Sequence, residues 1–261
     1  MKKPIKKQKA DNIDFVNVWE NIEQVVSKTE LDNLIDKSVS DIRKQTRGKR
    51  AGFGWSGGKD SIALQVVCEA AGIDLCVLGM SSKLEYKAFL EWVSENKPAG
   101  LWIWDSGLGD EFLLKSPHMV FPTESKHLAR WYAIQQHVAQ AKFFEQEKLD
   151  ILILGRRGQD GNYTGGRGKN IYTNRQGVTR FSPIVDWRHE HCMAAVHYYK
   201  GGNLPPFYQY ANGWVYGSGA WPAKMPRESK EQCWAELREV EPDTFSRLAP
   251  HFIEAQRAIN G

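Results

Sequence analysis

The chain of 261 residues has a hydrophobic share of 41% and a charged share of 25%, which is ordinary for a globular protein with a buried core. Its net charge of +4 is compatible with an anionic substrate but does not by itself indicate nucleic acid. No apolar run approaches the length of a membrane span, and no apolar segment follows the lysine-rich start. We therefore expect neither a membrane partner nor a signal peptide.

The first expected elements are helical. Apolar residues recur every three or four positions over residues 14–45, which predicts one or two amphipathic helices ahead of the core. A short apolar run, residues 51–55, predicts the first strand, and residues 61–71 are compatible with a helix. Between them lies a stretch that we call the glycine loop, residues 56–61, with the sequence Ser-Gly-Gly-Lys-Asp-Ser.

The glycine loop has the composition of an anion site. A turn between a strand and a helix gathers backbone N–H groups and the positive end of a helix dipole. Gly57 and Gly58 allow close approach of the backbone, and Lys59 adds a positive charge. The hydroxyls of Ser56 and Ser61 add short donors, so the expected ligand is a phosphate group.

Two commoner phosphate loops fit these residues less well. The Walker A pattern requires Ser or Thr after its lysine, whereas Lys59 is followed by Asp60. The dinucleotide pattern G-x-G-x-x-G is met by Gly52, Gly54 and Gly57, but the first two glycines fall inside the apolar run instead of the turn after it.

The rest of the chain alternates between apolar strands and helices. The further expected strands are residues 73–80, 101–104 and 149–154, and the further expected helices are residues 84–96, 126–147, a segment after Trp187, and residues 231–240 with more helix after them. This alternation predicts an α/β fold with a parallel twisted sheet, helices on both faces, and helical extensions at the N- and C-terminus. Residues 155–177, rich in glycine and basic groups, are expected to form a long mobile loop, and their composition is compatible with a lid over the nucleotide and equally with a nucleic-acid-binding loop.

Three segments together resemble one known family. The glycine loop resembles the PP-loop of the ATP pyrophosphatase superfamily, most closely in its PAPS reductase-like branch (PAPS is phosphoadenosine phosphosulfate). Arg156 and Arg157 follow the strand 149–154 as an arginine element does in that branch, although one residue is missing after Gly155. Residues 183–187, Pro-Ile-Val-Asp-Trp, are similar to its Pro-apolar-x-Asp-Trp turn, and Asp186 and Trp187 are expected to cap and brace the next helix.

This resemblance implies an adenine nucleotide α-hydrolase-like, Rossmann-like fold and an enzyme. It implies that residues 56–61 bind the phosphates of ATP or of a PAPS-like nucleotide with Mg²⁺, for which Asp60 is a candidate ligand. It further implies that Arg156 and Arg157 bind phosphate or sulfate and that Gly79 and Met80 lie at the adenine. The expected domains are a basic tail with a helical extension (residues 1–47), a nucleotide-binding α/β domain (48–200) and a C-terminal segment that completes the site (201–261).

The expected reaction is adenylyl transfer to an unknown acceptor with release of pyrophosphate. One alternative is PAPS reduction or sulfur transfer, including nucleic-acid thiolation, with Cys192 or Cys233 as the nucleophile. The reductases of the branch carry their cysteine in a Glu-Cys-Gly-x-His tail, whereas this chain has Glu-Gln-Cys-Trp at residues 231–234. Another alternative is a nucleotide-binding accessory subunit of a partner enzyme, and a homodimer is also compatible with the sequence.

The cysteines and histidines favour neither a cluster nor a zinc site. Four scattered cysteines without a Cys-x-x-Cys pair are typical of reduced cytoplasmic thiols, and no iron–sulfur cluster is expected. The segment after Trp187 holds His189, His191, Cys192 and His197, but it lacks the spacing of a known zinc motif.

Overall fold

The computed structural model describes residues 10–160, 169–175, 177–210, 212–217, 221–226 and 229–260. The strands are β1 (Ala51–Gly54), β2 (Cys76–Met80), β3 (Leu101–Asp105), β4 (Ile151–Ile153), β5 (Ile171–Thr173) and β6 (Thr179–Phe181). The helices of the first half are α1 (Asn12–Glu20), α2 (Ile22–Val25), α3 (Lys28–Thr46), α4 (Lys59–Ala71), α5 (Lys87–Asn96), α6 (Asp110–Lys115) and α7 (Ser125–Tyr132). Those of the second half are α8 (Val138–Gln146), α9 (His189–Lys200), α10 (Gly213–Tyr216), α11 (Lys230–Val240), α12 (Pro242–Leu248) and α13 (Ile253–Asn260).

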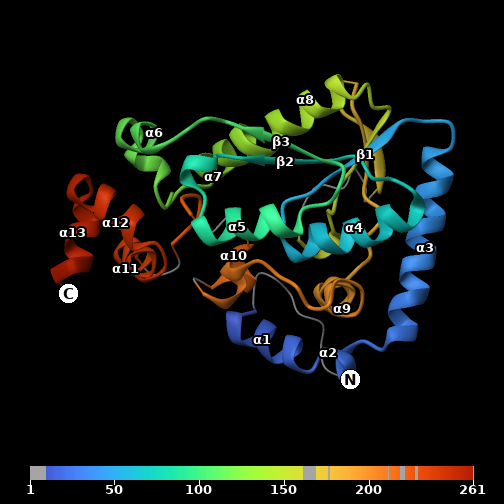
Figure 1. Cartoon of the computed structure of the whole chain (residues 1–261), viewed down its shortest axis with the longest axis horizontal. Helices are drawn as coiled ribbons and strands as arrows, with labels where there is room; N and C mark the ends of the chain where they lie inside the picture. Colours follow the sequence, from blue (N-terminus) through green and yellow to red (C-terminus); the bar gives the residue numbers. More distant parts are fainter. Residues whose placement is uncertain are drawn as a thin grey trace. The chain divides into compact units, whose positions relative to one another are not determined.

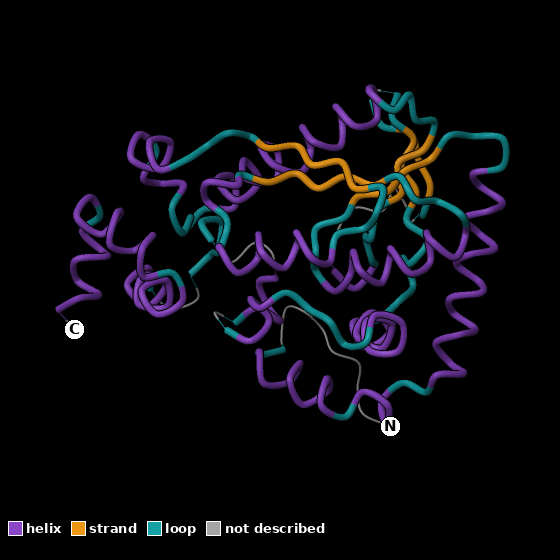
Figure 2. Tube along the Cα trace, in the orientation of Figure 1, coloured by secondary structure: helices purple, strands orange, loops and turns teal. Residues whose placement is uncertain are grey.

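The strands form one six-stranded sheet in the order β3-β2-β1-β4-β6-β5. Strand β1 runs parallel to both β2 and β4, β4 runs parallel to β6, and β5 pairs with β6 antiparallel. After β1 the chain therefore adds β2 and β3 on one side of β1, and it then adds β4 on the other side of β1. The predicted α/β fold with a largely parallel sheet is confirmed (Figures 1 and 2).

Helices cover both faces of the sheet, as predicted. In Figure 1, α8 lies on one face of the sheet, and α4 and α9 lie on the other. Two glycines in β1 allow α8 to come close. A Cβ on Gly52 would lie 2.8 Å from the ring of Phe143 in α8, and a Cβ on Gly54 would lie 3.6 Å from Gln140 in α8 and 3.2 Å from Leu154 after β4. Gly52 and Gly54 thus have a packing role inside a strand, which is contrary to the dinucleotide-turn alternative.

The N-terminal helices pack onto the same core. Helix α3 begins after Ser27, whose side chain accepts a hydrogen bond from the backbone N–H of Glu30, and it packs against α4 and α9. Ser38 in α3 accepts a hydrogen bond of 3.2 Å from the indole of Trp187. Trp187 therefore braces the start of α9 as predicted, but the predicted cap by Asp186 is wrong. The N-cap residue is Arg188, and the side chain of Asp186 is exposed and lies 3.8 Å from Lys37.

The contacts divide the chain into two compact units. The first comprises Met1–Leu78, Lys97–Ile103 and Ala139–Leu204, and the second comprises Gly79–Asn96, Trp104–Val138 and Pro205–Gly261. The N-terminal helices and most of the sheet thus share a unit. The domain boundaries expected from the sequence remain a prediction.

The predicted loop over residues 155–177 is wrong in part. It contains β5, which pairs with β6, and a short 3-10 helix, Gly158–Asp160. Residues 161–168 and 176 of the predicted loop lie outside the described residues. The predicted C-terminal helices are confirmed by α11, α12 and α13. Within the part of the chain that the structure describes, no helix is long and apolar enough to cross a membrane.

Candidate functional site

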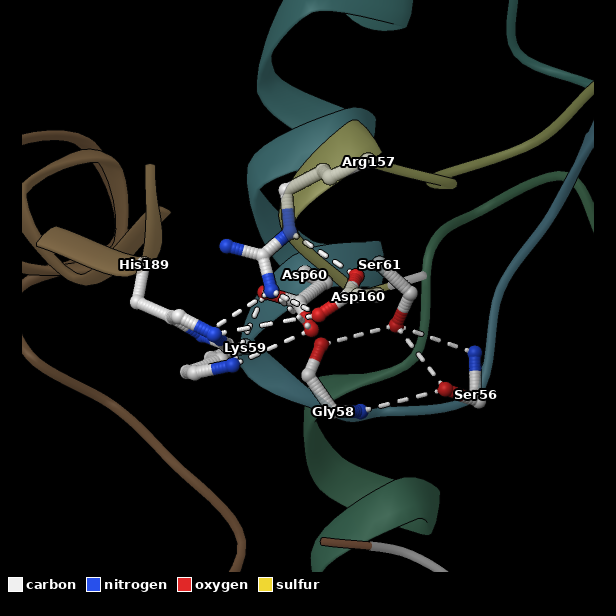
Figure 3. Close-up of polar contacts among 8 residues, drawn as sticks. All are labelled: Ser56, Gly58, Lys59, Asp60, Ser61, Arg157, Asp160 and His189. Atoms are coloured by element: carbon white, nitrogen blue, oxygen red, sulfur yellow. Dashed lines mark hydrogen bonds and ion pairs between the residues drawn. The ribbon is translucent and has the colours of Figure 1, made fainter. Parts of the chain in front are cut away.

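The glycine loop connects β1 to α4, as the sequence predicts. Gly57 adopts a φ of +69°, which glycine reaches without strain, and Gly58 is the N-cap residue of α4. Two serines hold the turn closed (Figure 3). Ser61 Oγ accepts a hydrogen bond of 3.0 Å from the Ser56 N–H and donates one of 2.8 Å to the Gly58 carbonyl. The serines therefore shape the loop so that the N-terminus of α4 faces outward from the end of β1.

The first turn of α4 adds a buried ion pair to this loop. The Lys59 ammonium lies 2.9 and 3.0 Å from the two carboxylate oxygens of Asp60. The Lys59 side chain is only 6% exposed, whereas that of Asp60 is 29% exposed. Burial lowers the pKa of Lys59, and the charge of Asp60 opposes this shift. An anion bound at the helix N-terminus would compete with Asp60 for the Lys59 ammonium.

The segment after β4 supplies a second cation from a distant part of the sequence. Arg157 donates a hydrogen bond of 2.8 Å to Asp160 and one of 3.4 Å to Asp60, and it is 0% exposed. Burial alone would favour the neutral acid at Asp60, but the charges of Arg157 and Lys59 hold the pKa of Asp60 well below its usual range. The same carboxylates raise the pKa of Arg157 against the effect of burial.

The strand order explains why these segments meet. Strands β2 and β4 flank β1 and run parallel to it, so the order in which strands are added to the sheet reverses at β1. A crevice at the carboxyl ends of two such strands is the usual ligand site of an open α/β sheet. The close approach of the segment after β4 to the first turn of α4 depends on Gly155, because a Cβ there would lie 3.2 Å from the carbonyl oxygen of Asp60.

Comparison with solved structures shows which fold the chain shares. A PAPS reductase from Candida auris, solved as a phosphate complex, is similar with a TM-score of 0.51 and 10% identity over 71% of this chain and 93% of that chain. The chain shares the fold of this PAPS reductase. Residues 56–61 resemble a PP-loop in sequence and lie between the first strand and its helix, so we call them the PP-loop below.

Two other solved structures are similar at lower TM-scores. An FMN adenylyltransferase from Candida glabrata, in complex with FMN and the ATP analogue AMPCPP, has a TM-score of 0.45 and 14% identity over 75% of this chain and 68% of that chain. The U34-tRNA thiolase NcsA from Methanococcus maripaludis, with its [4Fe-4S] cluster, has a TM-score of 0.42 and 14% identity over 88% of this chain and 79% of that chain. No protein-family model and no curated protein matches the sequence.

His189 joins the charged side chains beside the PP-loop, although the sequence indicated no role for it. We call this group the PP-loop cluster; its members are Lys59, Asp60, Arg157, Asp160 and His189. It lies in the first turn of α9, is 1% exposed, and its Nδ1 lies 2.9 Å from Nη2 of Arg157. Since an arginine can only donate, Nδ1 must be the acceptor of this hydrogen bond. The ring of Phe15 in α1 meets the imidazole edge-on at 5.2 Å. No local motif marks His189; only the packing of α9 against α4 brings it to Arg157.

The two predicted arginines point to opposite faces of the sheet. Arg157 reaches Asp60 and His189 on the face of α4 and α9. Arg156 instead donates a hydrogen bond of 3.3 Å from Nη1 to the hydroxyl of Tyr172 in β5. The structure therefore brings Arg157 to the PP-loop and gives Arg156 a different set of neighbours.

Gly79 and Met80 lie at the carboxyl end of β2, in the second compact unit. Met80 is buried, and its carbonyl accepts a hydrogen bond of 2.9 Å from the N–H of Ser106. Asp105, beside Ser106, accepts a hydrogen bond of 2.9 Å from Gly107 N–H. The role of Gly79 and Met80 at the adenine remains a prediction.

All four cysteines are buried and none forms a disulfide. Burial raises the pKa of Cys192 to about 12 even though the positive charges of Arg157 and Lys59 act on it in the opposite direction. Burial likewise raises the pKa of Cys233 to about 11. Both thiols are therefore protonated near neutral pH, which does not favour a thiolate nucleophile.

The described residues hold no group of three or more His, Cys, Asp or Glu side chains that could bind a metal ion. Mg²⁺ commonly binds through one or two carboxylates together with substrate phosphates. Asp60 fits that pattern as a single partly exposed carboxylate beside the PP-loop. Asp160 pairs with Arg157 as Asp60 does, but its side chain is only 6% exposed.

Proposed function

We propose that this chain is a PP-loop enzyme that binds ATP and transfers its adenylyl group to an acceptor, with release of pyrophosphate. The observation that carries the proposal is the contact of 3.4 Å between Arg157 and Asp60. It joins the PP-loop to the segment after β4 at the point where the strand order reverses, which is where such sheets bind nucleotides.

The PP-loop residues would bind the pyrophosphate part of ATP. The N–H groups of the first turn of α4 and the Lys59 ammonium supply positive charge, and Gly57 and Gly58 leave the backbone open to close approach. Because Arg157 has no exposed surface, its role in the proposal is to hold Asp60 in place rather than to touch the phosphates. Asp60 would hold Mg²⁺, which neutralises charge on the phosphates when it is bound.

The reaction forms one bond and breaks one. An acceptor oxygen forms a bond to the α-phosphorus while the bond to the bridging oxygen of the β-phosphate breaks, and pyrophosphate leaves with the electron pair. Such chemistry depends mainly on positioning and on charge stabilisation. Lys59 and the backbone of the PP-loop stabilise the charge that develops on pyrophosphate.

The test is the replacement Lys59→Ala with Lys49→Ala as the matched control. Lys49 is exposed and precedes β1, at the opposite end of that strand from the PP-loop. Loss of one such charged donor is expected to lower pyrophosphate release from ATP and Mg²⁺ by about tenfold to a thousandfold, whereas Lys49→Ala should change it less than about twofold. Unchanged turnover in Lys59→Ala would refute the assignment. ATP binding without turnover in the wild type, together with a co-purified enzyme, would instead indicate an accessory subunit.

The four buried, unpaired cysteines fit a protein that works in a reducing compartment, and we propose the cytoplasm. PAPS reduction and sulfur transfer are the competing activities, since a PAPS reductase shares the fold. Both would need a reactive thiol, and the burial of Cys192 and Cys233 is the reason that we place adenylyl transfer first.

A further inference from the structure

A second group of polar side chains lies on the other face of the sheet from the PP-loop cluster. Leu152 pairs with Gly52 on one side and with Arg180 on the other, and Arg180 pairs with Tyr172. Paired residues of neighbouring strands share a face, and Gly52 faces α8. Arg180 and Tyr172 therefore lie on the α8 face. Arg156 joins them through its hydrogen bond to Tyr172. We call these three residues the Arg–Tyr cluster.

The Arg–Tyr cluster places two positive charges close together. Burial lowers the pKa of Arg156, and the charge of Arg180 lowers it further, while Tyr172 acts in the opposite direction. Two guanidinium groups repel each other unless an anion lies between or beside them. Among the residues that the structure describes, no carboxylate lies within ion-pair distance of Arg180. The local charge is thus positive and is not balanced at Arg180 by the described part of the chain.

Two hydrogen-bond donors of the cluster have no acceptor among the described residues. The Nε of Arg180 is buried and makes no hydrogen bond there. The hydroxyl of Tyr172 accepts from Arg156, so its own proton can still be donated. A buried guanidinium N–H without an acceptor is unfavourable, and native proteins rarely leave one. An oxyanion would satisfy both donors and balance the charge of Arg180.

We propose that Arg156, Tyr172 and Arg180 form an anion subsite that binds a phosphate group of the acceptor substrate. Guanidinium groups match the geometry of phosphate and bind it through paired N–H donors. Because Arg156 directly precedes Arg157, the subsite and the PP-loop cluster flank the carboxyl end of β4 from opposite faces. The assignment to an acceptor rests on the proposed adenylyl transfer. The phosphate belongs either to a small ester or to the backbone of a nucleic acid.

The test measures binding of two probes, glycerol 3-phosphate and a short single-stranded oligonucleotide, to the full chain with and without saturating ATP. The variants are Arg180→Gln and Tyr172→Phe, and Arg180→Lys keeps the charge in case Arg180→Gln does not fold. Arg47→Gln is the control, since Arg47 is exposed and precedes β1. Loss of one charged donor should weaken binding of a probe by about tenfold to a hundredfold in Arg180→Gln and less in Tyr172→Phe. ATP affinity should change by less than about twofold.

Each outcome decides the proposal. Selective weakening of glycerol 3-phosphate supports a small phosphate ester, and selective weakening of the oligonucleotide supports a nucleic acid. The proposal is overturned if the wild type binds neither probe, if Arg180→Gln binds both as the wild type does, or if Arg180→Gln loses ATP affinity in parallel. Probe binding without ATP does not require adenylyl transfer. A chain that binds a probe through Arg180 but releases no pyrophosphate would therefore retain the subsite and refute only the proposed function.

Discussion

Arg157 and Asp60 are 97 positions apart in the sequence and share a hydrogen bond of 3.4 Å. This contact ties the segment after β4 to the PP-loop. Arg157 is completely buried, whereas the Asp60 side chain is 29% exposed. A ligand at the PP-loop can therefore reach Asp60 but not Arg157, and Arg157 acts by fixing the carboxylate.

Replacement of Arg157 by Gln is expected to lower both stability and turnover. The change would leave the buried carboxylate of Asp160 without its partner, which typically costs about 3–5 kcal/mol in the free energy of unfolding. Urea unfolding and pyrophosphate release measure the two effects. Arg156→Gln is the control for stability alone, since Arg156 is only half-buried, and an equal loss of stability in both variants would contradict the role given to Arg157.

Replacement of Gly155 by Ala should weaken ATP binding with little loss of stability. The added Cβ would lie 3.2 Å from the Asp60 carbonyl oxygen, so the PP-loop must shift by a few tenths of an ångström. We expect a drop in ATP affinity of about threefold to thirtyfold, measured by calorimetry, since small misplacements at such sites are costly. Gly158→Ala is the matched control, because its Cβ would meet only an ordinary contact of 3.6 Å. An unchanged affinity in Gly155→Ala would show that the loop tolerates the displacement.

His189 is predicted to be a positioning residue for Arg157. His189→Leu removes the acceptor at Nδ1 and should lower kcat by about tenfold while KM for ATP changes less. His189→Asn places an amide oxygen near the position of Nδ1 and should recover part of kcat. If His189→Leu and His189→Asn have the same kcat, the hydrogen bond to Arg157 does not account for the effect of His189 on turnover. A fall in kcat without partial recovery would then reflect packing against Phe15.

Neither Cys192 nor Cys233 is expected to be needed for pyrophosphate release. Burial raises the pKa of these thiols to about 12 and about 11, so little thiolate exists near neutral pH. Cys192→Ala and Cys233→Ala should therefore retain turnover within about threefold. ATP binding measured on the same samples serves as the control. A variant that binds ATP normally but has lost all activity would favour the sulfur-transfer alternative.

Glu85 should make stability depend on pH. Burial raises its pKa to about 8, with a smaller contribution from Asp105, compared with an ordinary value of 4.5. The unfolded chain therefore releases this proton at lower pH than the folded chain does. The resulting cost to stability is absent below pH 4.5, grows as pH rises to 8, and is constant above it.

The replacement Glu85→Gln removes this cost. We expect it to raise the free energy of unfolding by about 1–3 kcal/mol at pH 9 and to have almost no effect at pH 4. Urea unfolding at both pH values measures the difference. Glu91→Gln, an exposed change in α5, should show no such dependence. An equal effect of Glu85→Gln at both pH values would contradict the assigned pKa.

The elements with strong local patterns could be predicted from the sequence. Strands β1, β2, β3 and β4 are apolar runs, and the PP-loop is defined by six consecutive residues. Strands β5 and β6 have three residues each and mix apolar with polar side chains, so they are strands only because β6 pairs with β4 and β5 pairs with β6. Local pattern carries no information about such long-range pairing.

The part of the site that consists of residues adjacent in the sequence could be predicted. Lys59 and Asp60 lie in the motif itself, and their ion pair follows from adjacency. Arg156 and Arg157 look equivalent in the sequence, yet neighbouring residues at the end of a strand point to opposite faces. His189 enters the site from α9, which no spacing in the sequence indicates.

The separation of these partners also bears on how the protein is made. Residues 60, 157 and 189 must all be present before the PP-loop cluster is complete, since Arg157 contacts both Asp60 and His189. A growing chain still attached to the ribosome thus carries Lys59 and Asp60 through the synthesis of 97 further positions before Arg157, their stabilising partner, is added. Nucleotide capture should begin only after α9 has emerged from the exit tunnel, and stalled chains of increasing length would reveal the onset.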